Sequence, residues 1–160
     1  FQLITQVAGR AGRAEYPGHV IVQSYEPDHY AVRFAVRQDY RAFYAVESEA
    51  RRKSLYPPFT VIMRIVYSGD GAENVREAAE TAAAGLDRWL DETHQRESVI
   101  QMRALEAPIK LLRGKTRWQV YLKMYYKGDS ERIQKEMLRV AGASPDGIRA
   151  ELEVNPVNMF

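Results

Sequence analysis

The chain has 160 residues, about one typical domain, with 46% hydrophobic residues, 28% charged residues and a net charge of +2, as in an ordinary globular protein. It has no cysteine, which excludes a disulfide scaffold and a cysteine-based zinc site. No apolar run approaches the roughly 20 residues of a membrane span, and the first residues lack the basic flank and long apolar stretch of a signal peptide. We therefore expect a cytoplasmic protein with no membrane partner.

Residues 1–26 contain an octet, Gln6–Arg13, and then a β-branched run, His19–Tyr25, that predicts a strand after a turn. Residues 27–58 are predicted to be a helical connector, as one segment or two short helices, because apolar residues recur at helical spacing. The cluster Arg51-Arg52-Lys53 suits the negative end of a helix dipole. The prolines of Tyr56-Pro57-Pro58-Phe59 then end the helix.

Residues 59–160 are predicted to form one compact domain of the α+β class. Alternating apolar residues predict strands, and apolar residues at a spacing of about 3.6 predict helices. The order β-α-β-β-α-β is that of the ferredoxin-like split βαβ fold, in which two helices cover one face of a four-stranded antiparallel sheet. The expected strands span 60–67, 99–106, 118–126 and 148–154, and the expected helices span 72–91 and 130–141.

The octet has the pattern Q-x-x-G-R-x-G-R and resembles motif VI of superfamily 2 helicases. Arg10 and Arg13 would lie on one side of a helix and stabilise the charge that develops on a γ-phosphate. Gly9 and Gly12 would let the backbone approach the nucleotide, and Gln6 would add a polar contact. Residues 1–26 would then be the end of a second RecA-like lobe, with 19–25 as its last strand. The alternative is a surface helix start rich in small residues.

The segment 107–123 holds five basic and no acidic residues, whereas 69–99 holds eight acidic and three basic ones. Its Gly114-Lys115-Thr116 is like the end of a P-loop, but Ile109 stands where that motif needs glycine, so we expect a basic hairpin turn without a nucleotide. Basic side chains neutralise phosphates and aromatic rings stack on bases. The alternative is a solvated turn beside core aromatics such as Trp118. The candidate DNA contacts are Lys110, Arg113, Lys115, Arg117, Tyr121, Lys123 and Tyr125.

In chain order these motifs resemble the family of bacterial primosomal replication-restart DNA helicases over nearly the whole chain. The resemblance implies an ATP-dependent 3′-to-5′ helicase for abandoned forks, with Arg10 and Arg13 as its γ-phosphate arginines. It implies that this chain is a C-terminal fragment. Its domain from about Phe59 would be similar to a small-subunit ribosomal protein and would bind branched or forked DNA. The discriminating groups are Tyr56-Pro57-Pro58-Phe59 and, later in the chain, Arg113-Gly114 with Arg117-Trp118-Gln119. The closing Val154-Asn155-Pro156-Val157-Asn158 is a further mark of the resemblance.

The same resemblance implies partners and cofactors. The partners are single-stranded-DNA-binding protein, with Arg132 and Gln134 as candidate contacts, and other primosome proteins at the nucleoid. ATP, Mg²⁺ and zinc would bind elsewhere in the parent protein, so we expect this fragment to retain no cofactor and not to hydrolyse ATP by itself. An alternative function is a protein-docking or structural module that braces the motor. An RNA-binding module is less favoured, because the aromatic signature of such sheets does not occur.

Overall fold

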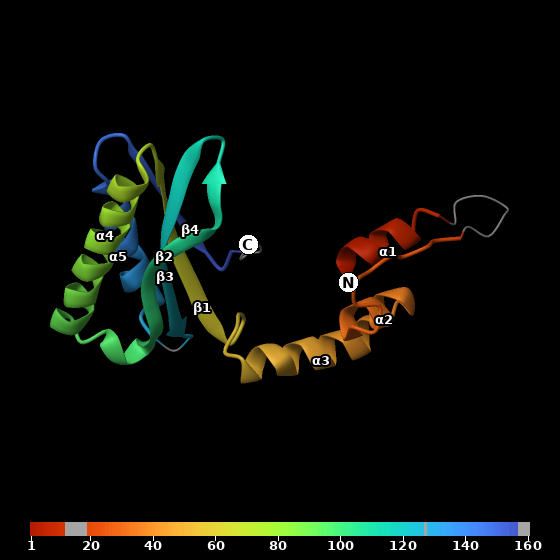
Figure 1. The fold of residues 1–160 in the computed structure, drawn as a ribbon. Helices are drawn as coiled ribbons and strands as arrows, with labels where there is room; N and C mark the ends of the chain where they lie inside the picture. The colour runs from red at the N-terminus through yellow and green to blue at the C-terminus, as the bar shows by residue number, and fades with distance from the viewer. Residues whose placement is uncertain (12–18, 127, 157–160) are drawn as a thin grey trace. The chain divides into compact units, whose positions relative to one another are not determined.

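The computed structural model describes residues 1–11, 19–126 and 128–156. Contacts divide the chain into two compact units, Phe1–Ser54 and Leu55–Phe160. Figure 1 shows the first unit in red to orange and the second in yellow to blue.

The first unit contains the helices α1 (Gln2–Ala8), α2 (Tyr30–Val36) and α3 (Tyr40–Lys53). The helices α2 and α3 confirm the predicted helical connector in its two-helix form. His29 begins α2 by accepting a hydrogen bond from the backbone N–H of Ala31, and Asp39 begins α3 by accepting one from Ala42. The basic cluster occupies the last turn of α3, where it suits the helix dipole.

Two expectations for the first unit are wrong. Residues 19–25 form no strand, and α1 ends at Ala8, so Arg10 lies in the turn that follows the helix. A β-branched run becomes a strand only when a neighbouring strand pairs with its backbone N–H and C=O groups, and the described part of this unit offers none. Gly9 is the C-cap of α1, because glycine is a poor helix former.

The second unit alternates strands and helices in the predicted order. Its strands form one sheet in the order β2-β3-β1-β4, and every neighbouring pair is antiparallel. This arrangement confirms the α+β, ferredoxin-like split βαβ fold. Its elements are β1 (Thr60–Gly69), α4 (Ala72–Glu92), a 3₁₀ turn (Arg96–Ser98), β2 (Val99–Leu112), β3 (Lys115–Tyr125), α5 (Ser130–Gly142) and β4 (Ile148–Val154).

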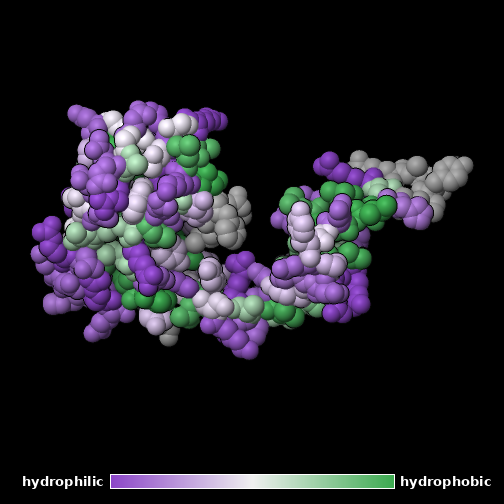
Figure 2. Space-filling view, in the orientation of Figure 1, coloured by the Kyte–Doolittle hydropathy of each residue, from purple (hydrophilic) through white to green (hydrophobic). Residues whose placement is uncertain are grey.

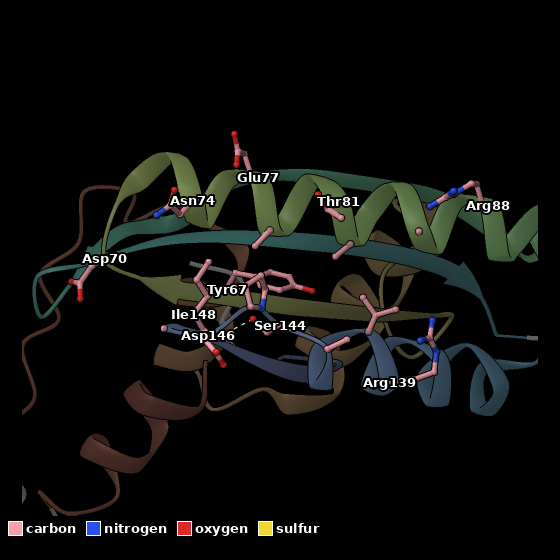
Figure 3. Close-up of a pocket in the computed structure, with 17 residues that line it drawn as sticks. Tyr67, Asp70, Asn74, Glu77, Thr81, Arg88, Arg139, Ser144, Asp146 and Ile148 are labelled. Carbon is pink, nitrogen blue, oxygen red and sulfur yellow. Dashed lines mark hydrogen bonds between the residues drawn. The ribbon is translucent and has the colours of Figure 1, made fainter.

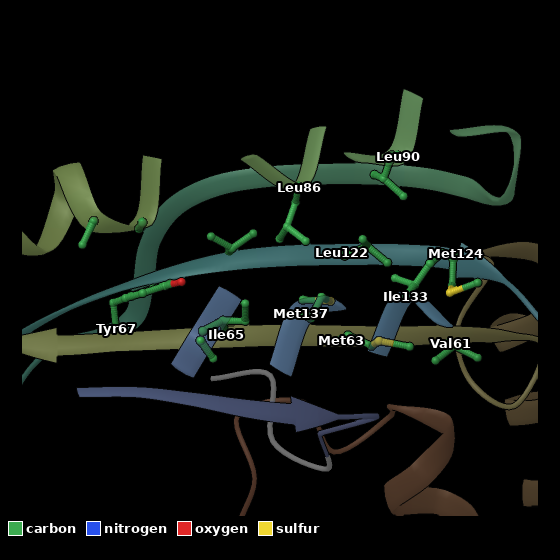
Figure 4. Close-up of a cluster of buried hydrophobic side chains, with 14 of the residues drawn as sticks. Val61, Met63, Ile65, Tyr67, Leu86, Leu90, Leu122, Met124, Ile133 and Met137 are labelled. Carbon is green, nitrogen blue, oxygen red and sulfur yellow. The ribbon is translucent and has the colours of Figure 1, made fainter. Parts of the chain in front are cut away.

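Both helices of this unit pack on one face of the sheet, with the core between them and the strands (Figures 1 and 4). Alternate residues of the central strands β1 and β3 point to the helices because successive side chains of a strand face opposite sides. Burying each side chain of this size contributes about 1.5–3 kcal/mol. The largest fully buried residues include Met63, Ile65, Tyr67, Leu86, Leu90, Leu122, Met124, Ile133 and Met137.

The strands β2 and β3 run further toward each other than the sequence predicted. They are joined by Arg113-Gly114 alone, and both residues have positive φ, 51° and 77°, as in a type I′ turn. The twist of that turn matches the twist of the strands, so Leu112 pairs with Lys115 and Leu111 with Thr116 directly beside it. The hairpin predicted around Gly114 is confirmed, and its position between two strands agrees with the exclusion of a P-loop.

Candidate functional site

The two groups of residues that the sequence singled out lie in different units. The octet belongs to the first unit, and the basic hairpin belongs to the second. Each group is therefore a separate candidate site.

The described candidate residues of the octet, Gln6, Gly9 and Arg10, are exposed. Gln6 lies on α1, Gly9 ends that helix, and Arg10 follows in a turn in which its backbone N–H donates to the carbonyl of Val7. Gly12 and Arg13 lie outside the described residues. The exposed guanidinium of Arg10 is suited to a phosphate supplied from elsewhere, because it keeps its charge and its fork of donors.

The basic hairpin presents its cations near its free end. The Lys115 Nζ lies 2.5 Å from a carboxylate oxygen of Asp70, and the Lys110 Nζ lies 2.7 Å from that of Glu106. The Nη1 of Arg117 donates to the carbonyl of Ile109 over 3.4 Å. Arg113 is exposed at the turn. Exposed ion pairs contribute only about 0–1 kcal/mol, so a phosphate can replace these carboxylates at little cost.

The other three candidates, Tyr121, Lys123 and Tyr125, lie toward the end of β3 that is far from the hairpin turn. Their side chains belong to the open face, defined as the face of the sheet opposite the helices. Lys123 is only 9% exposed, and its Nζ lies 4.4 Å from the centre of the Tyr56 ring. Burial lowers the pKa of Lys123. Tyr121 is half-buried, and burial followed by the neighbouring Tyr56 raises its pKa. Tyr125 is 48% exposed, so its ring is more accessible than that of Tyr121.

A cross-strand ion pair on this open face was not among the predicted site residues. The Nη2 of Arg64 on β1 lies 2.8 Å from the Oε2 of Glu153 on β4, and the two residues are register partners. Arg64 is almost buried, whereas Glu153 is more exposed. The pattern of the sequence contained a signal for it, because Arg64 interrupts the apolar residues of β1 at a position that alternation assigns to the open face.

A cavity of about 690 Å³ lies between α4, α5 and the loop before β4 (Figure 3). Ala78, Ala82 and Gly85 give α4 a surface of small residues along it, and Arg88 and Arg139 also line it. The sequence pattern did not indicate this cavity, because small residues at helical spacing are equally typical of close helix packing.

Tyr67 lines the same cavity, and its hydroxyl is buried with no hydrogen-bond partner among the described residues. Burial raises the pKa of Tyr67 to about 12. A buried hydroxyl without a partner costs about 1–3 kcal/mol, so Tyr67→Phe is expected to raise the free energy of unfolding by about 1 kcal/mol. Urea denaturation followed by circular dichroism measures this change. A loss of stability in the variant would contradict the isolated hydroxyl.

No helix within the described residues has the length and apolar character needed to cross a bilayer. Likewise, no three histidine or carboxylate side chains among them gather closely enough to hold a metal ion.

No family model matches the chain. The chain is 32% identical over 160 residues to replication restart protein PriA of Chlamydia pneumoniae, and equally to that of Treponema pallidum (strain Nichols). It is 48% identical over 82 residues to that of Bacillus subtilis (strain 168). These alignments cover 100%, 100% and 51% of this chain, but 21%, 23% and 10% of the respective relatives. The chain therefore spans about a fifth of the length of the relatives that it matches throughout.

Among solved structures, the full extracellular region of zebrafish Gpr126/Adgrg6 is 18% identical, and the match covers 63% of this chain and 14% of that one. The TM-score of 0.32 does not indicate a shared fold.

Proposed function

We propose that this chain, which belongs to the family of replication restart protein PriA, is the part of an ATP-dependent 3′-to-5′ DNA helicase that contacts branched or forked DNA during replication restart. The observation that carries the proposal is the exposed basic hairpin of β2 and β3, in a chain that aligns over its own full length with these relatives. The work of such a protein belongs to primosome assembly on the bacterial chromosome.

The electrostatics of the hairpin support DNA contact. Lys110, Arg113, Lys115 and Arg117 are all at or near its free end, and two of them are held only by exposed carboxylates. Neutralising phosphates releases condensed counterions, which gives such cations their affinity for DNA.

The octet supports a role in ATP hydrolysis by the intact protein. Arg10 is exposed and fits a γ-phosphate arginine, and we assign the same role to Arg13 from its place in the motif. ATP and Mg²⁺ would be held by other parts of the helicase, and zinc has no cysteine ligand in this chain. The fragment by itself is therefore expected to leave ATP intact.

A second candidate function is a docking module that braces the motor and binds single-stranded-DNA-binding protein. The first unit favours it: Ala35 is its one fully buried hydrophobic residue among those described, while Leu3, Val7, Ile21 and Tyr25 are largely exposed. Exposed apolar side chains in this number are typical of a surface that other protein covers. For α5, Arg132 and Gln134 remain the proposed contacts of that partner.

Replacing both Lys115 and Arg117 with alanine is expected to weaken binding to fork DNA and to reduce the slope of log affinity against log salt by about two, because each phosphate contact contributes about one. Fluorescence anisotropy of a labelled fork, titrated at several salt concentrations with the intact protein, measures both quantities. The control is Arg88→Ala with Lys135→Ala, which removes the same charge from the exposed surfaces of α4 and α5.

The two functions give different results. Unchanged fork affinity and salt slope in the hairpin variant, together with lost binding of single-stranded-DNA-binding protein in Arg132→Ala with Gln134→Ala, would support the docking module instead. No binding of the unaltered protein to forks at low salt would exclude DNA contact altogether.

A further inference from the structure

The free end of the β2–β3 hairpin carries exposed leucines as well as cations. Leu111 is 63% exposed and Leu112 is 47% exposed, and Ile109 nearby is also exposed. Figure 2 shows hydrophobic surface where this hairpin ends, next to hydrophilic surface. Apolar side chains so placed cost hydration free energy, and nothing in the predicted basic turn explains them.

Neither face of the sheet can bury both leucines. Successive residues of a strand point to opposite sides, so Leu111 faces the side of the helices and Leu112 faces the open side. Both remain exposed. The helix layer therefore does not reach Leu111 at the end of the hairpin, and no other described segment covers Leu112 on the open face. The leucines thus form an apolar tip, defined here as Leu111 and Leu112, that is available from both sides.

The charges around the apolar tip favour nucleic acid as its occupant. From Glu106 to Arg117 the hairpin has four basic residues and one acidic residue, a net charge of +3, and the pairing of Asp70 with Lys115 leaves +2. A partner that made only apolar contacts would not require these cations beside the leucines. The ends of a DNA duplex offer both partners, with a phosphate backbone at the sides and an apolar base-pair face between them.

We propose that the apolar tip is a wedge that packs against the last base pair where a DNA duplex parts into single strands, while Arg113, Lys115 and Arg117 hold the flanking phosphates. The proposal rests on the proposed function, because it assumes that the hairpin meets DNA. Apolar side chains inserted at base steps unstack them, and the free-energy cost of unstacking is lowest where pairing already ends. The wedge would therefore favour a fork junction over continuous duplex.

The test uses the intact protein and a fork with 2-aminopurine at the junction, whose fluorescence rises when its base unstacks. The double variant Leu111→Ser with Leu112→Ser is expected to lose most of this rise in fluorescence. Its preference for fork over linear duplex should fall about tenfold. Its affinity for linear duplex and its salt slope should stay unchanged. Leu138→Ser on α5, where the leucine is equally exposed, is the matched control.

Two further variants separate the possible outcomes. Leu111→Phe with Leu112→Phe keeps an apolar tip and should retain the fluorescence rise, whereas Lys115→Ala with Arg117→Ala should lower affinity but retain the rise at saturating protein. If the serine variant keeps both the rise and the fork preference, the wedge is wrong, although the proposed DNA contact stands. If it loses only the binding of a partner protein, the tip docks protein and the wedge is also wrong. If the unaltered protein does not bind forks at all, both proposals fail.

Discussion

Replacing Arg10 with alanine in the intact protein is expected to lower the rate of DNA-stimulated ATP hydrolysis by about a thousandfold or more, the effect of removing an arginine that stabilises a transferring phosphoryl group. The side chain is exposed just after α1, so the structure needs it for no core contact. The charge that spreads over the γ-phosphate oxygens in the transition state would then have lost a fixed, permanently charged donor fork. Steady-state hydrolysis measured with saturating fork DNA gives the change.

Two controls make this result specific. Arg41→Ala removes another exposed arginine, from α3, and should leave hydrolysis unchanged. Arg10→Lys keeps the charge but not the planar fork, so it should restore a small part of the rate. If the rate of ATP hydrolysis by the Arg10→Ala variant stays within a few fold of the rate of the unaltered protein, the octet does not act on the nucleotide.

Replacing Leu122 with alanine is expected to lower the free energy of unfolding of the second unit by about 3 kcal/mol, within the range known for leucines in well-packed cores. Leu122 is fully buried on β3, where its register partners are Met63 on β1 and Met102 on β2. The loss combines the transfer of the deleted methyl groups with the cavity they leave, because the central strands cannot collapse into it. Guanidinium denaturation followed by circular dichroism measures it.

The matched control is Leu138→Ala on α5. Leu138 is 61% exposed, and alanine is the better helix former, so this variant should change stability by less than about 0.5 kcal/mol. Equal losses from the two leucines would mean that the sheet does not form the core in this arrangement.

Local periodicity was sufficient to predict the fold of the second unit. Val61, Met63 and Ile65 alternate with Ile62 and Arg64, which predicts a strand with one face toward the core, and the structure has that strand. The same reasoning placed the helices α4 and α5 within a residue or two of their ends. It failed for residues 19–25, because a strand also needs a partner, and a partner is not a property of the segment itself.

For the candidate sites too, local patterns predicted some features and not others. The alternation of β3 assigned Tyr121, Lys123 and Tyr125 to the open face, and their register with β1 agrees. It could not predict that Lys123 would be buried beneath the Tyr56 ring, since Tyr56 is far away in the sequence. The roles of Arg10 and of the hairpin cations remain predictions, since no contact of the described residues tests them.

The basic hairpin is where the two sources of information differ most. The sequence by itself determined its cations, its turn at Gly114 and its place between two strands, because charge and turn preference are local properties. Only the tertiary structure decided that Leu111 and Leu112 stay exposed, that Lys123 is buried and that the Tyr67 hydroxyl has no partner among the described residues. Burial depends on which distant elements reach a side chain, and in this fold the helix layer covers the centre of the sheet but not the end of its hairpin.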